Sequence, residues 1–495
     1  MPPFSRRLFI AGAATIPFSL WFNRYLKAQS VLTRYDASSP EGRAMLIKYA
    51  EAVRSMKNNG EGQPLNWIFQ WYTHHVRDDT TKSSEISRVY VDPADPHRAL
   101  AEEMWDTCQS HYLPPQFQKF FLPWHRMYVF FFERIVRKLC GDPGFALPYW
   151  DYSSTGPARH GVIPSQFTMK NDATFGPLFI ENRNPGVNTG VPIDQGQPGN
   201  PLGLGALSEC SYDVQGVKQG FCSKLDRGLH GQVHVLTGDP LNMGDVPWAA
   251  NDPVFWLHHC NIDRLWAGWN RAGRQNLSDP AWLNQPFVFA DENGNRVAAS
   301  IKDFVDITQL GYTYERFEPV PSCPPLGPLN AAAANVQTHA IVPGGPIKLG
   351  SGPVQVSLEA PAGTEPPVPL TARVTGLKAG RHLYLVLRDL RANFQPGTLY
   401  HLYLELPAEM KIEQAQSYYV GVINFFDAAG RHAHANGSEA TTGVTAFVSF
   451  DVTNTAKRLT AAKKLTSKPI ITITPIGQPK SEAKALIGGI TLVEQ

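Results

Sequence analysis

Apolar residues recur with helical spacing along the first half of the chain. Over 41–57 they mostly fall three or four positions apart, which predicts a helix with one buried face. The segments 67–76, 120–135 and 251–266 are rich in apolar and aromatic residues and also read as helices. At the start of the last one, Asp252 suits the cap and Pro253 the first helical position. These segments predict a mainly α-helical domain.

The last third of the chain has a different pattern. Short segments at 354–358, 382–387, 400–406 and 470–474 are rich in β-forming residues and alternate apolar with polar positions, as in an antiparallel β-sandwich. Proline, glycine and alanine dominate 321–346, which predicts a linker between a helical domain at 30–320 and a β domain at 347–495. A glycine- and proline-rich region from Asp151 to about Gly205 predicts long loops.

The predicted helix at 251–266 contains adjacent histidines, His258 and His259. Neighbouring residues of a helix point about 100° apart, so only one of the two rings aims at a given point. We choose His259, because Phe255 one turn before it and Asp263 one turn after it share its face and could orient the imidazole. His259 is therefore a candidate metal ligand.

A second histidine pair strengthens this interpretation. His230 and His234 are four residues apart, which places both side chains on one helical face with Cβ atoms about 5–6 Å apart. That is a spacing for metal chelation. With His259 they predict a site of three imidazoles, and imidazole suits copper, zinc, iron or nickel.

The aromatic segment 120–135 supplies a further histidine, His125. Together with His111 and either His74 or His75 it forms a second set of three. Two sets of three histidines, with no carboxylate or thiolate clearly among the ligands, point to a pair of copper ions. Two ions held close together can pass two electrons to one dioxygen molecule, which a single copper(I) cannot do.

The motifs that carry these histidines resemble a known family. Pro-Trp-His-Arg at 123–126, the His230/His234 pair and the run 252–266 together resemble the binuclear (type 3) copper family of tyrosinases, catechol oxidases and hemocyanins. Segments at 281–294 and 310–314 resemble plant-type polyphenol oxidases, and 450–452 and 488–491 resemble their C-terminal domain more weakly. The resemblance implies a helical bundle that holds two copper ions. It also implies that the protein uses O2 to oxidise o-diphenols to o-quinones, and it leaves open whether monophenols are hydroxylated as well.

The resemblance also bears on the less certain ligands. Gln70, four residues before His74, matches the family pattern and favours His74 over His75. The interval from His111 to His125 is longer than usual in the family, so His97 stands as the alternative to His111. Family members often join a cysteine to this ligand through a thioether, and Cys108 is either such a partner of His111 or an ordinary buried thiol.

Three residues around the predicted centre are candidate catalytic residues. Phe255 occupies the family position of an aromatic gate for the substrate ring, although plain core packing explains it equally well. Asp226 stands where monophenol-hydroxylating relatives often have a glutamate, and Gly231 replaces an asparagine that would help to hold a water. The resemblance therefore favours diphenol oxidation over monophenol hydroxylation, and it implies a β domain that covers the copper cavity.

The composition of the chain indicates which classes of binding partner to expect. The 495 residues carry a formal charge of +2, which favours neither nucleic acid nor an anionic membrane and fits O2 and a small phenolic or catecholic substrate. A homo-oligomer is compatible with this composition. Six cysteines fit an oxidising compartment but are too few for a disulfide scaffold, and Cys210 could pair with Cys222.

The first residues read as an export signal. Arg6 and Arg7 precede an apolar stretch that is too short to span a bilayer as a helix with ordinary flanks, which is typical of a twin-arginine signal peptide over 1–29. The alternative is a small membrane anchor. We expect export of the folded, copper-loaded protein to the periplasm or the medium, with no membrane attachment of the mature form.

Three other functions remain to be separated from diphenol oxidation. An o-aminophenol oxidase of the same family would carry the same motifs. A hemocyanin-like oxygen-binding protein would use the same six histidines but exclude phenols. A zinc or di-iron hydrolase would usually place Asp or Glu between its metals, whereas these clusters contain only histidine.

Overall fold

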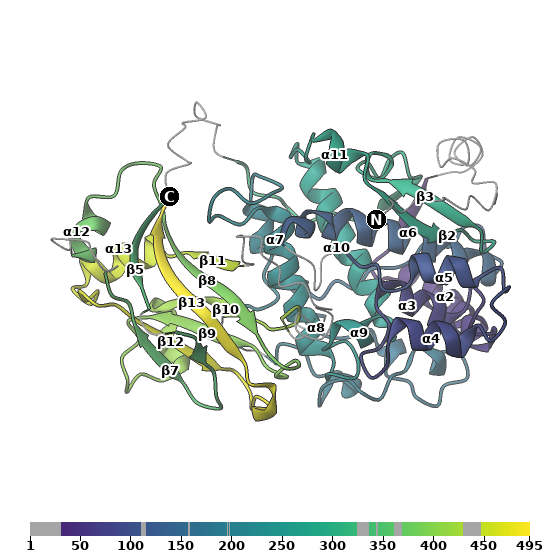
Figure 1. Cartoon of the computed structure of the whole chain (residues 1–495), viewed down its shortest axis with the longest axis horizontal. Helices are drawn as coiled ribbons and strands as arrows, with labels where there is room; N and C mark the ends of the chain where they lie inside the picture. The colour runs from purple at the N-terminus through teal and green to yellow at the C-terminus, as the bar shows by residue number, and fades with distance from the viewer. Residues whose placement is uncertain are drawn as a thin grey trace, which may run out of the picture.

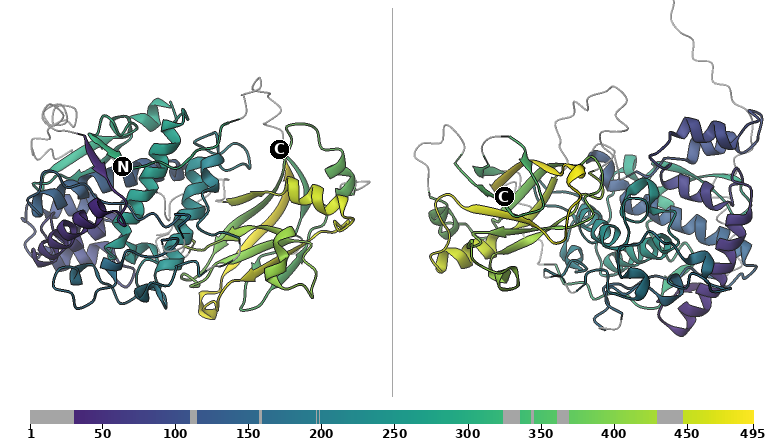
Figure 2. Two further views of the ribbon diagram at one scale, coloured as in Figure 1. Left: turned by 180° about the vertical axis from the view of Figure 1, so that it is seen from behind. Right: turned by 90° about the horizontal axis from the view of Figure 1, so that it is seen from below.

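The chain forms a helical part and a β part that lie side by side (Figures 1 and 2). This computed structural model describes residues 31–109, 115–156, 159–195, 197, 199–323, 336–342, 345–360, 369–428 and 447–495. Within them the order of elements confirms a mainly α-helical domain followed by an antiparallel β-sandwich. The predicted signal peptide at 1–29 lies outside the described residues.

The helical part is built from short and long helices in sequence order. They are α2 (Pro40–Asn58), α3 (Trp67–His74), α4 (Lys82–Val89), α5 (Arg98–Met104), η1 (Pro115–Phe120), α6 (Phe121–Leu139), α7 (Phe221–Leu225), η6 (Asp226–His230), α8 (Gly231–Thr237), α9 (Val246–Ala249), α10 (Val254–Arg271) and α11 (Pro280–Leu283). Two small sheets accompany them, made of β1 (Leu32–Arg34) with β4 (Tyr312–Tyr314) and of β2 (Pro286–Ala290) with β3 (Arg296–Ser300). The helices predicted at 41–57, 67–76, 120–135 and 251–266 correspond to α2, α3, α6 and α10.

Helices α6 and α10 pack against each other at the centre of this part. They are buried on nearly all sides, as their aromatic sequences predict. Phe132 of α6 stacks on Trp256 of α10 with ring centroids 3.4 Å apart. Burial of two such large rings removes apolar surface from water and aligns the two helices that carry His125 and His259.

Asp263 anchors α10 and does not orient His259. Its carboxylate accepts hydrogen bonds from the hydroxyls of Tyr312 and Tyr314, both at 2.6 Å, and pairs with Arg34 Nη1 at 3.1 Å. It also pairs with Arg126 of α6. The expectation that Asp263 orients the His259 ring is therefore wrong, because arginines and tyrosines from distant segments take its oxygens.

The start of α10 is close to the prediction. The helix begins at Val254, and Asp252 Oδ1 accepts a hydrogen bond from the Val254 N–H at 3.0 Å. Pro253 precedes the first helical residue instead of occupying that position. Arg183, from the long loop region, pairs with Asp252 at 2.8 Å with both side chains fully buried. The glycine- and proline-rich loops thus hold the base of the helix that carries the adjacent histidines.

The β part is a sandwich of two antiparallel sheets. One has the order β10-β9-β12-β7 and the other β11-β8-β13-β5, with β6 also paired to β13. Their bounds are β5 (Gln337–Ile341), β6 (Ile347–Lys348), β7 (Val354–Ser357), β8 (Leu383–Arg391), β9 (Tyr400–Leu404), β10 (Tyr419–Ile423), β11 (Phe447–Asp451), β12 (Ile470–Pro475) and β13 (Leu486–Glu494). Helices α12 (Leu370–Thr375) and α13 (Thr453–Ala461) flank the sheets.

A separate hydrophobic core fills the sandwich. Alternate residues of both sheets face inward, such as Leu385 and Leu387 of β8 against Leu402 and Leu404 of β9. The four segments predicted as strands match β7, β8, β9 and β12. Strand β5 lies within the segment expected to be a linker, because its proline- and glycine-rich surroundings hide the alternation of a five-residue strand.

One disulfide differs from the sequence prediction. Cys210 pairs with Cys323, and Cys222 is a buried free thiol, so the expected Cys210–Cys222 pair is wrong. The reason is topological, since the chain after β4 returns past the loop that carries Cys210. No helix among the described residues is both long and apolar enough to cross a bilayer.

Candidate metal centre

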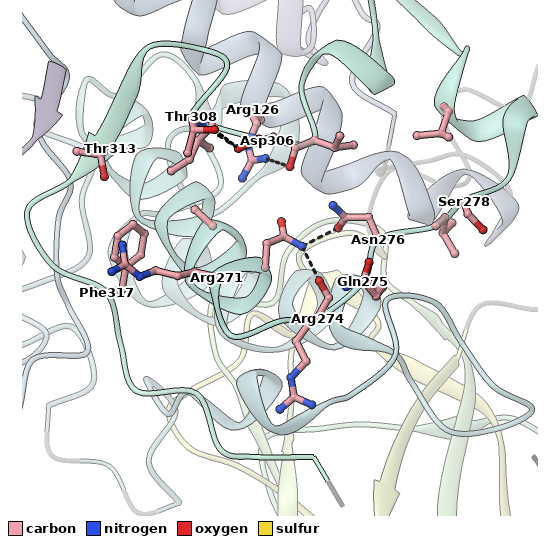
Figure 3. A pocket seen from close by; sticks show the side chains of 16 residues that line it. Arg126, Arg271, Arg274, Gln275, Asn276, Ser278, Asp306, Thr308, Thr313 and Phe317 are labelled. Atoms are coloured by element: carbon pink, nitrogen blue, oxygen red, sulfur yellow. Dashed lines mark hydrogen bonds between the residues drawn. The ribbon is translucent and has the colours of Figure 1, made fainter. Parts of the chain in front are cut away.

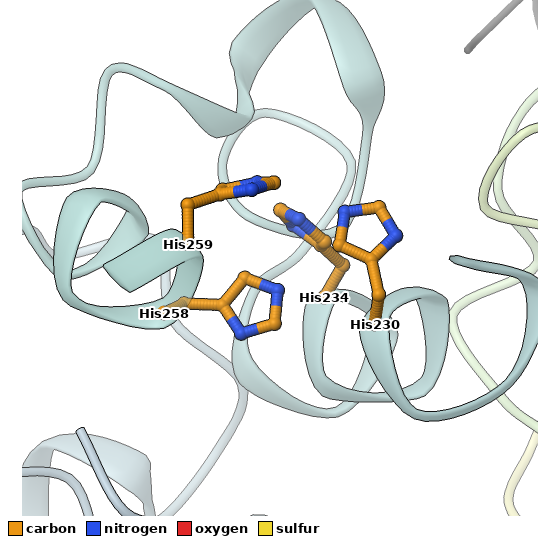
Figure 4. Close-up of side chains that lie close together, drawn as sticks. All are labelled: His230, His234, His258 and His259. Carbon is orange, nitrogen blue, oxygen red and sulfur yellow. The ribbon is translucent and has the colours of Figure 1, made fainter. Parts of the chain in front are cut away.

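Two clusters of metal-binding side chains lie inside the helical part. The four-histidine cluster contains His230, His234, His258 and His259, and the thiol cluster contains His74, Cys108 and His125. Within each cluster the potential ligand atoms lie within 4.8 Å of one another. Figure 4 shows His230 and His234 extending from successive turns toward His258 and His259. All seven side chains are buried.

Local helix geometry places the first histidine pair. His230 ends the π-helical segment η6 and His234 lies one turn further in α8, with ring centroids 4.6 Å apart. Gly228 inside η6 has non-helical backbone angles, φ −96° and ψ −112°. Single-turn π segments often occur at functional sites. The spacing of four residues thus brings both rings to one face, as the sequence predicts.

Backbone carbonyls fix the orientation of two rings. His125 Nδ1 lies 2.9 Å from the Phe121 carbonyl and His234 Nδ1 lies 2.9 Å from the Met243 carbonyl. Each ring therefore donates from Nδ1 and keeps its Nε2 lone pair for another partner. Metal-bound histidines commonly have this arrangement.

The electronic state of the cluster favours metal binding. Burial lowers the pKa values of His125, His234, His258 and His259 well below the ordinary value of 6.5, so these rings are neutral near pH 7. Among the described residues, Nε2 of His234 and both ring nitrogens of His258 and His259 have no hydrogen-bond partner. Buried nitrogens of this kind are costly unless they bind something, and the donor set fits a soft or borderline metal ion.

The two clusters touch each other. The rings of His125 and His259 stack with centroids 4.2 Å apart and planes 8° from parallel. His125 and His230 are 6.2 Å apart. Metal ions held by the two clusters would therefore be close neighbours, as a shared small ligand requires.

The structure brings both histidines of the adjacent pair to the first cluster. The centroid of His258 lies 4.7 Å from that of His234, and the centroid of His259 lies 5.7 Å from it. His259 alone of the two stacks on His125. Adjacent helical residues point in different directions, and His259 accordingly faces His125 of the thiol cluster. Nothing in the sequence indicated that the His258 ring would also lie close to His234.

The other candidate ligands are placed as follows. His74 belongs to the thiol cluster, whereas His75 Nδ1 lies 2.7 Å from Asp106 Oδ1. His97 precedes α5 on the surface beside Asp95. His111 lies outside the described residues. The assignment of His74, His111, His125, His230, His234 and His259 as the ligands remains a prediction.

Cys108 is buried directly beside a proposed copper ligand. Its sulfur is 3.7 Å from His125 Nε2. Backbone hydrogen bonds from Asp106 to the Tyr72 carbonyl at 2.8 Å and from Cys108 to the His74 carbonyl at 3.3 Å hold this segment against the end of α3. The thioether to His111 remains a prediction.

Two of the three candidate catalytic residues, Phe255 and Asp226, lie directly against the rings. Phe255 is fully buried, and its ring centroid lies 4.2 Å from His259, 5.1 Å from His74 and 5.9 Å from His234. It forms a wall between the clusters. Asp226 Oδ1 lies 3.1 Å from His230 Nδ1, and burial raises the pKa of its carboxyl.

Sequence reasoning missed the residues that the β part contributes. The ring of Phe426 stacks on His234 with centroids 4.1 Å apart and planes 11° from parallel, and it meets His230 edge-on at 5.6 Å. Phe426 packs in the core of the helical part instead of the sandwich core. No periodicity or motif in its sequence neighbourhood distinguishes it from an ordinary core aromatic residue.

A separate cavity of about 580 Å³ lies beside α10 (Figure 3). Arg126, Arg271 and Arg274 line it together with Asp306 and apolar side chains. Of the described residues that line it, none is a histidine, so this cavity is distinct from the metal centre.

Family comparisons cover most of the chain. Residues 66–202 and 203–272 match the family described as the common central domain of tyrosinase, and 276–322 match the polyphenol oxidase middle domain. Residues 345–495 match a domain of unknown function. The two clusters thus lie within the tyrosinase match, and Phe426 lies within the uncharacterised domain.

Individual proteins similar to this chain include tyrosinases and polyphenol oxidases. A tyrosinase from Hahella sp. (strain CCB-MM4) is 32% identical over 56% of this chain and 62% of its own length. Catechol oxidase B of Solanum tuberosum, described as chloroplastic, is 31% identical over 41% of this chain and 39% of its own. The chain thus spans less than two thirds of either relative. The structure of latent apple tyrosinase has the same fold, with a TM-score of 0.58 and 21% identity over 94% of this chain and 98% of that one.

Proposed function

Because this chain belongs to the tyrosinase and polyphenol oxidase family, whose metal centre is a pair of copper ions, we propose that it oxidises o-diphenols to o-quinones with O2. Two o-diphenol molecules give two o-quinones while one O2 is reduced to two molecules of water. The supporting observation is the contact between two buried clusters that contain imidazoles, with His125 stacked on His259.

The side chains present fit copper. In this proposal His230, His234 and His259 hold one ion, and His74, His125 and the undescribed His111 hold the other. Bound copper would supply O2 binding and the two-electron oxidation of the substrate. The chain itself keeps the imidazoles of His125 and His234 neutral by burial and fixes these two rings through the Phe121 and Met243 carbonyls.

The surrounding side chains have positioning roles. Asp226 lies against the His230 ring and Phe255 against His259, so both restrict the movement of proposed ligands. Gly231 offers no side chain to hold a water with Asp226. We therefore expect diphenol oxidation to be faster than monophenol hydroxylation. The Phe255 ring packs between the two clusters, and its gating of a substrate ring is part of the same proposal.

An oxygen-uptake assay tests the reaction. The copper-loaded chain is offered dihydroxyphenylalanine, tyrosine and o-aminophenol in parallel. Uptake with dihydroxyphenylalanine and none with tyrosine indicates a catechol oxidase, and faster uptake with o-aminophenol indicates an o-aminophenol oxidase. Reversible O2 binding without turnover of any phenol would contradict the proposal and favour a hemocyanin-like protein.

The β domain acts in this proposal as a cover of the centre. Phe426 occupies the face of His234 on which a substrate ring would otherwise stack. Deleting residues after 323 keeps the Cys210–Cys323 disulfide and removes the cover. We expect faster oxidation of bulky catechols by the shortened chain. Unchanged rates in a soluble, copper-loaded product would contradict a covering role.

The proposal includes export by the twin-arginine route. The supporting feature is the Arg6-Arg7 pair before an apolar stretch. Replacing both arginines with lysine should retain the protein inside the cell, as fractionation of the expressing bacterium would show.

A further inference from the structure

The β domain fills the space beside His230 with a side chain of its own. Gly231 has ordinary helical angles, φ −62° and ψ −32°, so its backbone does not require glycine. A Cβ atom at this position would lie 2.6 Å from Asn424 Oδ1 and 3.0 Å from Asn424 Nδ2. The contact with Asn424, and not the backbone conformation, therefore excludes a side chain at position 231.

Asn424 is fixed at both ends of its amide. Nδ2 donates to the Arg227 carbonyl at 2.8 Å, and Oδ1 accepts from the Phe426 N–H at 3.1 Å. The residue is 6% exposed. Moving the amide aside would leave buried polar groups without these bonds, so the side chain cannot yield cheaply to a neighbour at position 231.

The irregular helix segment η6 presents the Arg227 carbonyl to Asn424. In a regular α-helix this carbonyl would accept from the N–H of Gly231. Here the Gly231 N–H bonds to the carbonyls of Asp226 and Gly228 instead. The π-helical turn and the missing side chain at Gly231 thus serve the same contact.

The same loop carries two further contacts with the helical part. Phe426 stacks on His234, and Asp427 pairs with Arg227 at 3.0 Å with both side chains largely buried. Asn424, Phe426 and Asp427 therefore all contact residues 227–234 of η6 and α8. The position of Phe426 over the imidazoles depends on the register of this loop.

We propose that Gly231 is a docking determinant for the β domain, since its missing side chain admits Asn424 and thereby sets Phe426 over His230 and His234. This inference rests on the proposed covering role of the β domain. A side chain at position 231 shifts the equilibrium toward an undocked arrangement without any cut in the chain.

Hydrogen exchange of the full-length, metal-free chain tests the contact without relying on activity. We expect G231A to accelerate exchange of the Phe426 amide about tenfold, because undocking removes the helical part that buries Phe426 and the Arg227 carbonyl that holds its acceptor, Asn424. G205A is the matched control. Gly205 lines a cavity of about 390 Å³ between the two parts, and a Cβ there has no atom within 4 Å.

A double-mutant cycle separates this contact from a general effect on the helix. The nearest atoms to a Cβ at position 231 all belong to Asn424, so N424A makes room for it. Adding G231A to N424A should therefore change exchange of residues 425–427 less than about twofold. Should G231A fail to fold, N424Q enlarges the same contact from the sandwich side and should give the same acceleration.

Two results would overturn the inference. One is unchanged exchange at 424–427 in G231A, and the other is an equal effect of G231A with and without Asn424. Oxygen uptake of the copper-loaded variants is recorded separately. If every variant is inactive but the exchange pattern holds, the proposed oxidation fails and the docking role stands. If activity is present but the pattern is absent, the docking role fails alone.

Discussion

The two ligand clusters differ in how the chain builds them. The four-histidine cluster comes from η6, α8 and α10, and the spacing of four residues along η6 and α8 aligns the rings of His230 and His234. The thiol cluster combines the end of α3, an irregular segment at Cys108 and the middle of α6. Local periodicity therefore predicts the His230/His234 half of the four-histidine cluster, whereas the rest of that cluster and the whole thiol cluster depend on how distant segments pack.

The clusters also differ in what packs on their rings. Tyr128 and Phe255, both from the helical part, pack on His74. Phe426 from the β part stacks on His234. The difference shows that the β part contacts the four-histidine cluster, whereas the two rings that pack on His74 of the thiol cluster come from the helical part.

Removal of a proposed ligand should have the largest effect. We expect H234A to bind one copper ion fewer per chain and to lose activity by on the order of a thousandfold, because three imidazoles hold each ion in this proposal. H125A should do the same from the other cluster. Metal analysis and oxygen uptake measure both.

H97A is the control for these variants. His97 is a partly exposed residue near Asp95 and should be dispensable. Loss of one copper ion in H97A would instead show that His97, and not His111, is the third ligand of that ion. Full copper content in H234A would remove the four-histidine cluster from the proposed centre.

Removal of the cover should have the next largest effect. F426A deletes a ring stacked on His234, and a stacking contact of about 1.4 kcal/mol corresponds to a tenfold shift in equilibrium. We expect the full-length variant to oxidise bulky catechols about tenfold faster. F426L keeps part of the side-chain bulk, so its rate with bulky catechols should lie between those of the unmodified chain and F426A. A slower F426A that retains its copper would count against the cover.

Acid should destabilise the metal-free chain, mainly through the four-histidine cluster. Burial lowers the pKa values of three of its rings and of His125 in the thiol cluster. Below the unfolded value of 6.5 the unfolded chain binds protons that the folded chain does not, so the free energy of unfolding falls as pH decreases. Above that pH the contribution is complete.

The slope of this loss reports the number of rings. Each such group contributes up to about 1.4 kcal/mol per pH unit. H258Q removes one such ring, so the slope of the free energy of unfolding against pH should decrease by the contribution of one proton. Urea unfolding at several pH values between about 5 and 7 would measure this slope. A free energy of unfolding that stays constant over that interval would contradict the burial of neutral imidazoles.

Loss of the sulfur at Cys108 should have the smallest effect. We expect C108S to retain both copper ions and to lose activity only a few-fold, since the sulfur orients an imidazole at most. C222S, which removes another buried free thiol, is the control. Thiol titration of the unfolded, unreduced chain decides the cross-link: four thiols mean none, and three mean a thioether at Cys108.

Local sequence carries much of the fold and part of the site. The spacing of His230 and His234, and of apolar residues around His125 and His259, determines helices that present these rings, because one turn repeats every 3.6 residues. Alternation likewise predicts β8, β9 and β12. These features depend on residues that are close in sequence, so they can be predicted without the rest of the chain.

Contacts between distant segments were decided only by the tertiary structure. The pairing of Cys210 with Cys323, the capture of Asp263 by arginines and tyrosines, and the stacking of Phe426 on His234 each join residues more than one hundred positions apart or from different elements. No periodicity encodes such contacts, because they arise from how whole elements pack. The sequence thus determined which side chains face inward, and packing of the two domains decided which of them meet at the metal centre.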